Sequence, residues 1–295
     1  MSTALPPYSY KDSLKSDISD EPVNVWLQRP IAGLVTRAVF SYPITPNQLT
    51  VVAVLFGIAG GVLLSGEHSQ LRAAAVCFYL KDIFDSADGQ LARAKQLYSR
   101  RGRFLDSIGD FVVNLSLFIG VFIVLQKDGV APYAALALSV VGFLGVSLRV
   151  SYHVFYQTSF LHSQNEYQTN RIAEDLQEQD YENDRLTVSL QKTFLFLYGW
   201  QDRLMQRLDT WSRRKVPSTF GSERAQWHAD AAGLRLGGFL GIGTEYVLLT
   251  TSLLLGSVWL YLIFSLIVLN GVWIMTIFYR RSVLAERIRG ARKEE

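Results

Sequence analysis

Four aspartates in one short stretch of the sequence have the spacing of a shared metal site. Asp85 and Asp88 lie three positions apart, and Asp106 and Asp110 lie four apart, so each pair falls on one face of a helix. Both pairs adjoin strongly apolar segments, where an unpaired charge is unfavourable. Four carboxylates gathered there need cations, and Mg²⁺ and Mn²⁺ prefer such oxygen ligands. The stretch therefore predicts a divalent metal site at the edge of a membrane.

The surrounding sequence indicates helices that cross a membrane. The chain has 295 residues, of which 49% are hydrophobic, and these residues gather in long runs. Each run has roughly 17–25 residues, the length a helix needs to cross about 30 Å of hydrocarbon. The predicted spans are Gln48–Leu64, Leu71–Leu91, Phe104–Leu125, Ala131–Phe155, Leu234–Leu255 and Val258–Tyr279. We therefore expect an all-α polytopic membrane protein with six transmembrane helices, which carries the aspartate pairs on the second and third.

The segments outside the spans differ in character. Residues 1–42 form a cytoplasmic N-terminal segment, in which Val23–Phe40 has the pattern of an amphipathic helix in the membrane interface. Residues 43–156 contain the first four spans. The remaining segments are a polar, helical cytoplasmic insertion at 157–232, the last two spans at 233–281 and a cytoplasmic tail at 282–295.

Basic residues predict the orientation of the chain. They concentrate in the N-terminal segment, after the second span, in the insertion and in the tail, whereas the opposite connections carry little beyond Arg72 and Lys127. The positive-inside rule then places both termini and the aspartates on the cytoplasmic side. The net charge of +3 does not suggest a nucleic-acid partner. We expect the basic side to meet the anionic headgroups of the lipid bilayer.

The residues between the aspartates resemble a known signature. Every fixed position of the CDP-alcohol phosphotransferase motif, D-x2-D-G-x2-A-R-x8-G-x3-D-x3-D, is matched. The matching residues are Asp85, Asp88, Gly89, Ala92, Arg93, Gly102, Asp106 and Asp110. Thr45-Pro46-Asn47, before the first span, also resembles the family. The likeness covers about Pro43 to Tyr156, whereas the last two spans agree only in topology and the insertion has no counterpart in the motif.

This resemblance implies metal-dependent transfer of a substituted phosphoryl group from a CDP-linked donor to an alcohol, with release of CMP. Two ions about 3.5–4 Å apart between the carboxylate pairs would stabilise the entering and leaving oxygens. Asp85, Asp88 and Asp106 are the expected ligands. Asp110 is the expected general base and a further candidate ligand. The residues that the resemblance places near the nucleotide are Asp85, Asp88, Gly89, Ala92 and Arg93.

The motif leaves the substrates open. CDP-diacylglycerol with a polar alcohol is the simplest pair, but CDP-choline or CDP-ethanolamine with diacylglycerol, and CDP-inositol with inositol phosphate, use the same signature. Arg100, Arg101 and Arg103 either receive an anionic acceptor or serve only as inside-positive residues. Arg149, late in the fourth span, is a further candidate for the cavity. The resemblance also implies a homodimer, on which the sequence itself is silent.

Two other classes of membrane protein use intramembrane carboxylates. Ion and proton transporters line their pathways with them, but the Gly, Ala-Arg and Gly between the two pairs are not explained by transport. Membrane prenyltransferases bind pyrophosphate through Asp-rich motifs, but those motifs lie far apart in the sequence. Lys81 and Asp82 precede the signature inside the second span, and we expect an internal Lys–Asp ion pair there rather than another metal ligand.

Overall fold

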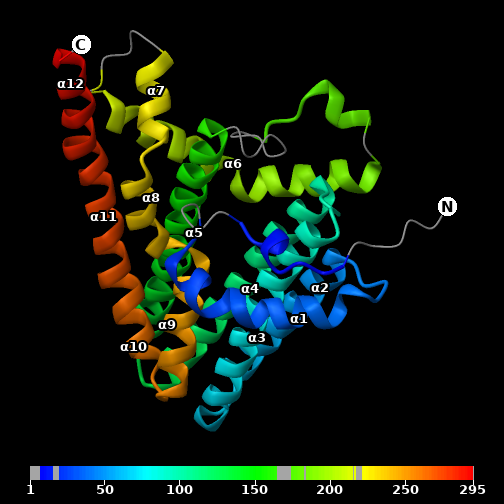
Figure 1. Ribbon diagram of the computed structural model, residues 1–295. Helices are drawn as coiled ribbons and strands as arrows, with labels where there is room; N and C mark the ends of the chain where they lie inside the picture. Colours follow the sequence, from blue (N-terminus) through cyan, green and yellow to red (C-terminus); the bar gives the residue numbers. More distant parts are fainter. Residues whose placement is uncertain are drawn as a thin grey trace.

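The protein is a bundle of helices (Figure 1). The computed structural model describes residues 7–15, 20–164, 174–182, 184–214, 216 and 221–294, and all regular elements in these residues are helices. The helices before the insertion are α1 (Arg29–Phe40), α2 (Pro46–Leu64), α3 (Leu71–Ala94), α4 (Arg100–Lys127) and α5 (Pro132–Ser163). The later helices are α6 (Arg185–Arg213), α7 (Gly221–His228), α8 (Ala231–Gly237), α9 (Ile242–Leu254), α10 (Val258–Ile263), α11 (Asn270–Tyr279) and α12 (Ala285–Glu294).

Within the part of the chain that the structure describes, four helices are long and apolar enough to cross a membrane. They are Pro46–Leu64, Arg100–Lys127, Pro132–Ser163 and the continuous rod Val258–Gly290, which runs from α10 into α12. The rod is the orange-to-red edge of the molecule in Figure 1. The all-α membrane protein is thus confirmed. The number six stays a prediction, because α3 carries the charged signature residues and α9 has only 13 residues.

The predicted fifth span, Leu234–Leu255, is divided between α8 and α9. The division falls at Gly238–Gly241, where a short 3₁₀ turn replaces the α-helix. Glu21 from the N-terminal segment reaches this turn, and its carboxylate accepts the backbone N–H of Gly243 at 3.3 Å and of Thr244 at 3.0 Å. These are unpaired donors of the first turn of α9, so Glu21 caps that helix. A Cβ at Gly241 would lie 2.0 Å from the Glu21 side chain, so only glycine fits there.

Small residues bring α2 close to the two helices that carry the signature. Ideal Cβ atoms at Gly57 and Gly61 of α2 would lie 2.4 Å and 2.0 Å from Val113 and Ser116 of α4. Gly60 approaches the ring of Phe78 on α3 in the same way. Small residues commonly allow such backbone approach between membrane helices. The packing of α2 on both α3 and α4 therefore fixes their relative position.

The helix predicted for the N-terminal segment is present, with a π-helical turn at Asn24–Gln28 before α1. Buried Ala32 and Phe40 pack in one cluster with Ala87 and Leu91 of α3. Trp26 and Leu34, by contrast, are 84% and 68% exposed. An apolar surface of this kind suits the headgroup region of a bilayer. The segment thus packs on α3 through one face and leaves apolar side chains outside.

The insertion is also helical, as predicted. Its main helix, α6, begins where the Asp184 side chain accepts the backbone N–H of Thr187 at 2.6 Å, a regular N-cap. Figure 1 shows α6 lying across the end of α4, and the two helices are in contact. Residues 165–173, 183, 215 and 217–220 of the predicted insertion lie outside the described residues.

Candidate active site

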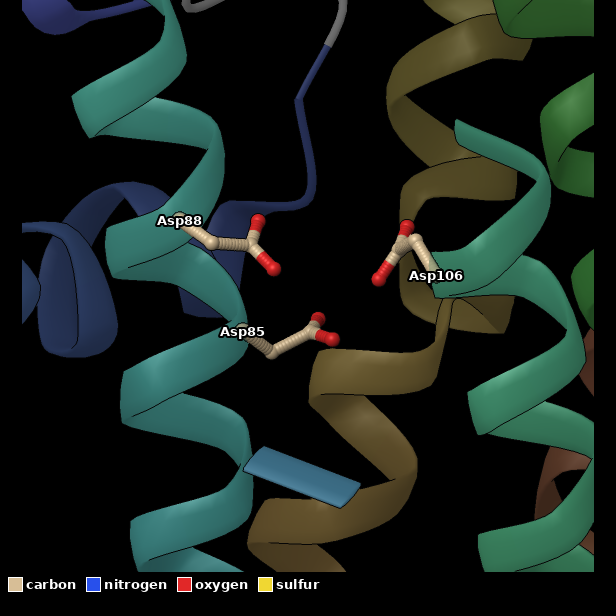
Figure 2. A group of neighbouring side chains, drawn as sticks. All are labelled: Asp85, Asp88 and Asp106. Carbon is tan, nitrogen blue, oxygen red and sulfur yellow. The ribbon is translucent and has the colours of Figure 1, made fainter. Parts of the chain in front are cut away.

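Three of the four signature aspartates meet in space. Oxygen atoms of Asp85, Asp88 and Asp106 all lie within 4.8 Å of one another. Figure 2 shows the two side chains of α3 and the one of α4 pointing toward a common point. A set of three carboxylates is the kind of oxygen-ligand set that Mg²⁺ or Mn²⁺ prefers. The residues present therefore fit a divalent cation at this point.

The start of α4 is built to hold Asp106 in place. The Ser99 side chain caps the helix by accepting the backbone N–H of Gly102 at 3.0 Å. Asn47, at the start of α2, is so close that a Cβ at Gly102 would lie 2.6 Å from its Oδ1 atom. The signature glycine thus allows α2 and α4 to touch one turn before Asp106. This contact explains why Asn47 occurs together with the signature residues.

Thr50 orients one of the clustered carboxylates. Its hydroxyl donates to Asp88 Oδ2 at 2.5 Å, and Asp88 is only 9% exposed. A hydrogen bond to a ligating carboxylate fixes its orientation toward the metal. Sequence reasoning missed Thr50, although a hydroxyl one turn into an otherwise apolar helix was a visible signal.

The fourth aspartate, Asp110, is bound to a lysine. The ammonium group of Lys81 donates to Asp110 Oδ1 at 2.5 Å and lies 3.2 Å from Asp85 Oδ1. Lys81 is fully buried, and the ring of Tyr246 lies 4.8 Å from its Nζ atom. The expected pairing of Lys81 with its neighbour Asp82 is thus replaced by an ion pair that joins α3 to α4. The Asp82 carboxylate instead accepts a hydrogen bond from Gln28.

The residues predicted to contact the nucleotide lie beside the N-terminal segment. Gly89 and Arg93 line the same cavity as the aspartates, whereas Ala92 is partly buried next to them. Arg93 Nε donates to the backbone oxygen of Ser13 at 2.6 Å. A Cβ at Gly89 would lie 3.4 Å from Arg93 Nη1, which is ordinary van der Waals contact, so the guanidinium group alone does not require glycine there.

The cavity has a volume of about 400 Å³ and is enclosed by segments far apart in the sequence. The N-terminal segment contributes Lys15 and Arg29, and the insertion contributes Phe194, Tyr198 and Asp202. The Tyr198 hydroxyl donates to the backbone oxygen of Ser107 at 2.8 Å. Burial raises the pKa of Tyr198, and the negative charges of Asp110 and Asp106 raise it further. The insertion is thus a wall of the site, which the signature did not predict.

Two of the candidate acceptor arginines are bound to this insertion. Arg100 pairs with Glu174 at 2.8 Å and with Asp180, and Arg103 pairs with the same Glu174. The side chains of both acids are 1–2% exposed. Of Arg100 and Arg103, it is Arg103 that lines the cavity, and Glu174 already neutralises its charge.

The other two candidate arginines lie elsewhere. Arg101 borders a shallow groove between α2 and α4, whose apolar lining comes from Ile44, Leu49, Val51, Val52 and Leu105. Arg149 does not line the cavity, contrary to the sequence-based expectation. Its guanidinium donates to Glu245 at 2.9 Å and to the backbone and side chain of Ser265. A buried arginine needs such partners, and α9 and the C-terminal rod supply them.

Residues 43–202, more than half of the chain, match the family described as CDP-alcohol phosphatidyltransferase. The chain belongs to this family. The carboxylate cluster is formed by residues of the family signature. The family assignment replaces the transporter and prenyltransferase interpretations.

Two curated archaeal proteins are similar to part of this transferase. A bifunctional IPC transferase and DIPP synthase from Thermococcus kodakarensis is 39% identical over 71 residues, which cover 24% of this chain and 16% of the relative. The protein of the same name from Archaeoglobus fulgidus is 27% identical over 99 residues, which cover 34% and 19%. This chain therefore aligns with less than a fifth of the length of either relative.

Proposed function

We propose that the enzyme transfers a phosphatidyl group from CDP-diacylglycerol to the hydroxyl group of a polar alcohol, a step of phospholipid biosynthesis. The observation that carries this proposal is the convergence of Asp85, Asp88 and Asp106 on one point, beside Asp110, in a chain with membrane-spanning helices. Three of the carboxylates are the proposed ligands of two Mg²⁺ or Mn²⁺ ions, with Asp110 as a fourth. Bound metal would neutralise the pyrophosphate and the charge that develops on the leaving group.

The residues of the chain supply the remaining chemistry. Asp110 accepts the proton of the acceptor hydroxyl as its oxygen attacks the phosphorus atom that carries the lipid. The new P–O bond forms as the bond from that phosphorus to the bridging oxygen breaks, and CMP leaves with the electron pair. The ammonium group of Lys81, 2.5 Å from Asp110 Oδ1, favours the carboxylate form of Asp110 and holds it beside the cavity. Gly89 and Arg93 are the proposed nucleotide contacts.

The groove between α2 and α4 supports a lipid donor. Both helices are candidate membrane spans, and the groove is apolar except at Arg101 and the first turn of α2. Val51 in this groove is 47% exposed, as expected for a side chain that faces acyl chains. The groove begins beside Leu105, next to the ligand Asp106. The donor's acyl chains would fit it with the headgroup at the metal site.

We further propose that α3 and the α8–α9 segment complete six spans, with the site and both termini on the cytoplasmic side. The distribution of Lys and Arg residues supports this orientation. A homodimer is part of the same proposal. Cysteine-accessibility labelling at positions 11 and 292, and cross-linking in native membranes, would test the sidedness and the dimer.

CDP-inositol-type transfer is the second candidate, because the two similar archaeal proteins carry the names IPC transferase and DIPP synthase. Choline- or ethanolamine-type transfer to diacylglycerol is a third use of the same signature. All three release CMP, so they differ only in donor and acceptor.

One assay separates these candidates. The purified full-length enzyme in lipid nanodiscs is incubated with CDP-diacylglycerol, CDP-inositol, CDP-choline or CDP-ethanolamine, with Mg²⁺ or Mn²⁺ and a panel of alcohols. We expect CMP and a new phospholipid from CDP-diacylglycerol, and neither after chelation of the metal. CMP from CDP-inositol alone would support the second candidate. No CMP from any donor would contradict the enzymatic assignment.

A further inference from the structure

The N-terminal segment and the insertion form two walls of the cavity, and each wall lies against a different signature helix. The N-terminal wall lies against α3, where Arg93 contacts Ser13 and Gln90 Nε2 donates to the backbone oxygen of Arg29 at 3.0 Å. The insertion wall lies against α4, where Tyr198 contacts Ser107. Asp110, the proposed base, belongs to α4. An acceptor hydroxyl must reach Asp110, so the acceptor enters along the insertion wall.

The walls also differ in charge. The N-terminal wall carries the cations Lys15 and Arg29 and also the acids Asp20 and Glu21, and Arg29 pairs with Asp20 at 2.7 Å, so the charges of this wall are balanced. The insertion wall brings the carboxylates of Glu174 and Asp202 into the cavity. The arginine that lines this wall, Arg103, is already paired with Glu174. A phosphorylated acceptor at this wall would therefore find the charge of Arg103 already neutralised by Glu174.

Asp202 is the unpaired acid of the insertion wall. It makes no hydrogen bond or ion pair with any residue that the structure describes, although it lines the cavity. Burial raises its pKa to about 6, an effect that the nearby charge of Arg103 partly opposes. Asp202 is therefore ionised at pH 7 and above, in a partly desolvated position. An unpaired carboxylate in such a position attracts a cation.

Aromatic rings of the insertion and of α4 line the same cavity as Asp202. Tyr198 is one helical turn away, and its ring centroid lies 5.2 Å from that of Phe194 and 6.2 Å from that of Phe111. All three side chains line the cavity. Ring faces attract ammonium groups, most strongly where water is excluded. A carboxylate beside several rings is the combination that recognises amino and quaternary ammonium groups.

We propose that the insertion selects an acceptor alcohol that carries a positively charged amino or ammonium group. The cation lies against Asp202, Tyr198 and Phe194, and the hydroxyl group faces Asp110. This inference rests on the proposed function, because it assumes that the alcohol is the acceptor and that the lipid is on the donor. It makes Asp202 a specificity-determining residue of the insertion.

The test compares acceptors at constant CDP-diacylglycerol and Mg²⁺. Choline, ethanolamine and serine represent ammonium alcohols, glycerol and inositol represent neutral ones, and glycerol 3-phosphate and inositol phosphate represent anions. We expect kcat/KM to be at least about tenfold higher for an ammonium alcohol than for the others. Asp202→Asn should lower that preference about tenfold, mainly through KM. Glu182→Gln, which removes an exposed carboxylate of the same insertion, should leave the preference unchanged.

A second measurement does not depend on a variant. Tetramethylammonium chloride, which has no hydroxyl group, should inhibit the wild-type enzyme competitively against the acceptor, whereas equal NaCl should not. Two results would overturn the inference: a preference of the wild-type enzyme for anionic or neutral acceptors, or an equal loss of kcat/KM for all acceptors in Asp202→Asn. In either case, CMP release would still support the proposed function. Absence of CMP release from CDP-diacylglycerol with every acceptor would instead contradict the proposed function.

Discussion

The ammonium group of Lys81 lies 2.5 Å from the carboxylate of Asp110, so a buried ion pair connects α3 to α4 within the candidate active site. The same ammonium group lies 3.2 Å from Asp85. Lys81 therefore offsets the repulsion among the signature carboxylates, a task that it would share with bound metal. This relationship leads to the first prediction.

Lys81→Met should destabilise the protein and make its stability depend on metal. Removal of one partner of a buried ion pair costs about 3–5 kcal/mol, because the other charge is left uncompensated. Added Mg²⁺ should restore part of the loss by supplying positive charge. Thermal unfolding followed by tryptophan fluorescence, with and without Mg²⁺, measures both effects. An unchanged melting temperature in the absence of metal would contradict the compensating role of Lys81.

Asp110→Asn should abolish turnover without abolishing nucleotide binding. The amide cannot accept the hydroxyl proton, and general-base catalysis typically contributes about 10²–10⁴-fold to the rate. CMP release in a single turnover measures the chemical step, and displacement of labelled CDP measures binding. Full activity in this variant would refute the assignment of Asp110 as the base.

Thr50→Val should weaken metal binding while the ligands remain intact. Loss of a hydrogen bond to a metal-ligating group typically costs 10- to 100-fold in metal affinity or activity, about the range expected here. The Mg²⁺ concentration at half-maximal CMP release should rise accordingly. Thr193→Val, which removes an exposed hydroxyl on α6, is the matched control and should leave this concentration unchanged. Equal effects in both variants would show that the Thr50 hydroxyl does not act through Asp88.

Glu174→Gln should release two arginines at the edge of the cavity. Glu174 binds both Arg100 and Arg103, so the amide leaves their charges partly uncompensated. We expect faster hydrogen exchange at the start of α6 and a several-fold gain in the relative kcat/KM of a phosphorylated acceptor. If exchange in α6 is unchanged, these ion pairs do not hold the insertion to α4.

Because of Asp209, the stability of the fold should fall as the pH becomes acidic. Burial alone would raise its pKa, but the imidazole of His228 at 3.7 Å, the charge of Arg213 and the hydrogen bond from Trp227 lower it to about 2. A carboxylate with a lowered pKa stabilises the fold above its unfolded value of about 3.8, and this stabilisation is lost as the pH falls toward 2. Asp209→Asn should therefore lower the melting temperature at pH 7, and the difference from wild type should shrink between pH 4 and pH 2. A pH-independent difference would contradict this linkage.

The sequence predicted the signature residues of the site better than the segments that enclose the cavity. Spacing on a helix determines which side chains share a face, so the carboxylates of α3 and their meeting with Asp106 could be anticipated. Glu174 could not be assigned, because its acidic surroundings look like a solvated surface until Arg100 and Arg103 are found beside it. Arg149 illustrates the same difficulty, since its partner Glu245 lies 96 positions away. The break at Gly241 also depends on a distant residue, Glu21.

The cap that Glu21 places on α9 has a consequence for the order of biogenesis. The two groups are separated by 222 positions in the chain, whereas α3 and α4 are neighbours joined by a short turn. A ribosome must therefore deliver most of the polypeptide to the membrane before the N-terminal segment finds its partner on α9, and contacts between close neighbours form first. The part of the bundle that carries the aspartate cluster can assemble early during synthesis. The contact between the N-terminal segment and α9 forms only near the end of synthesis.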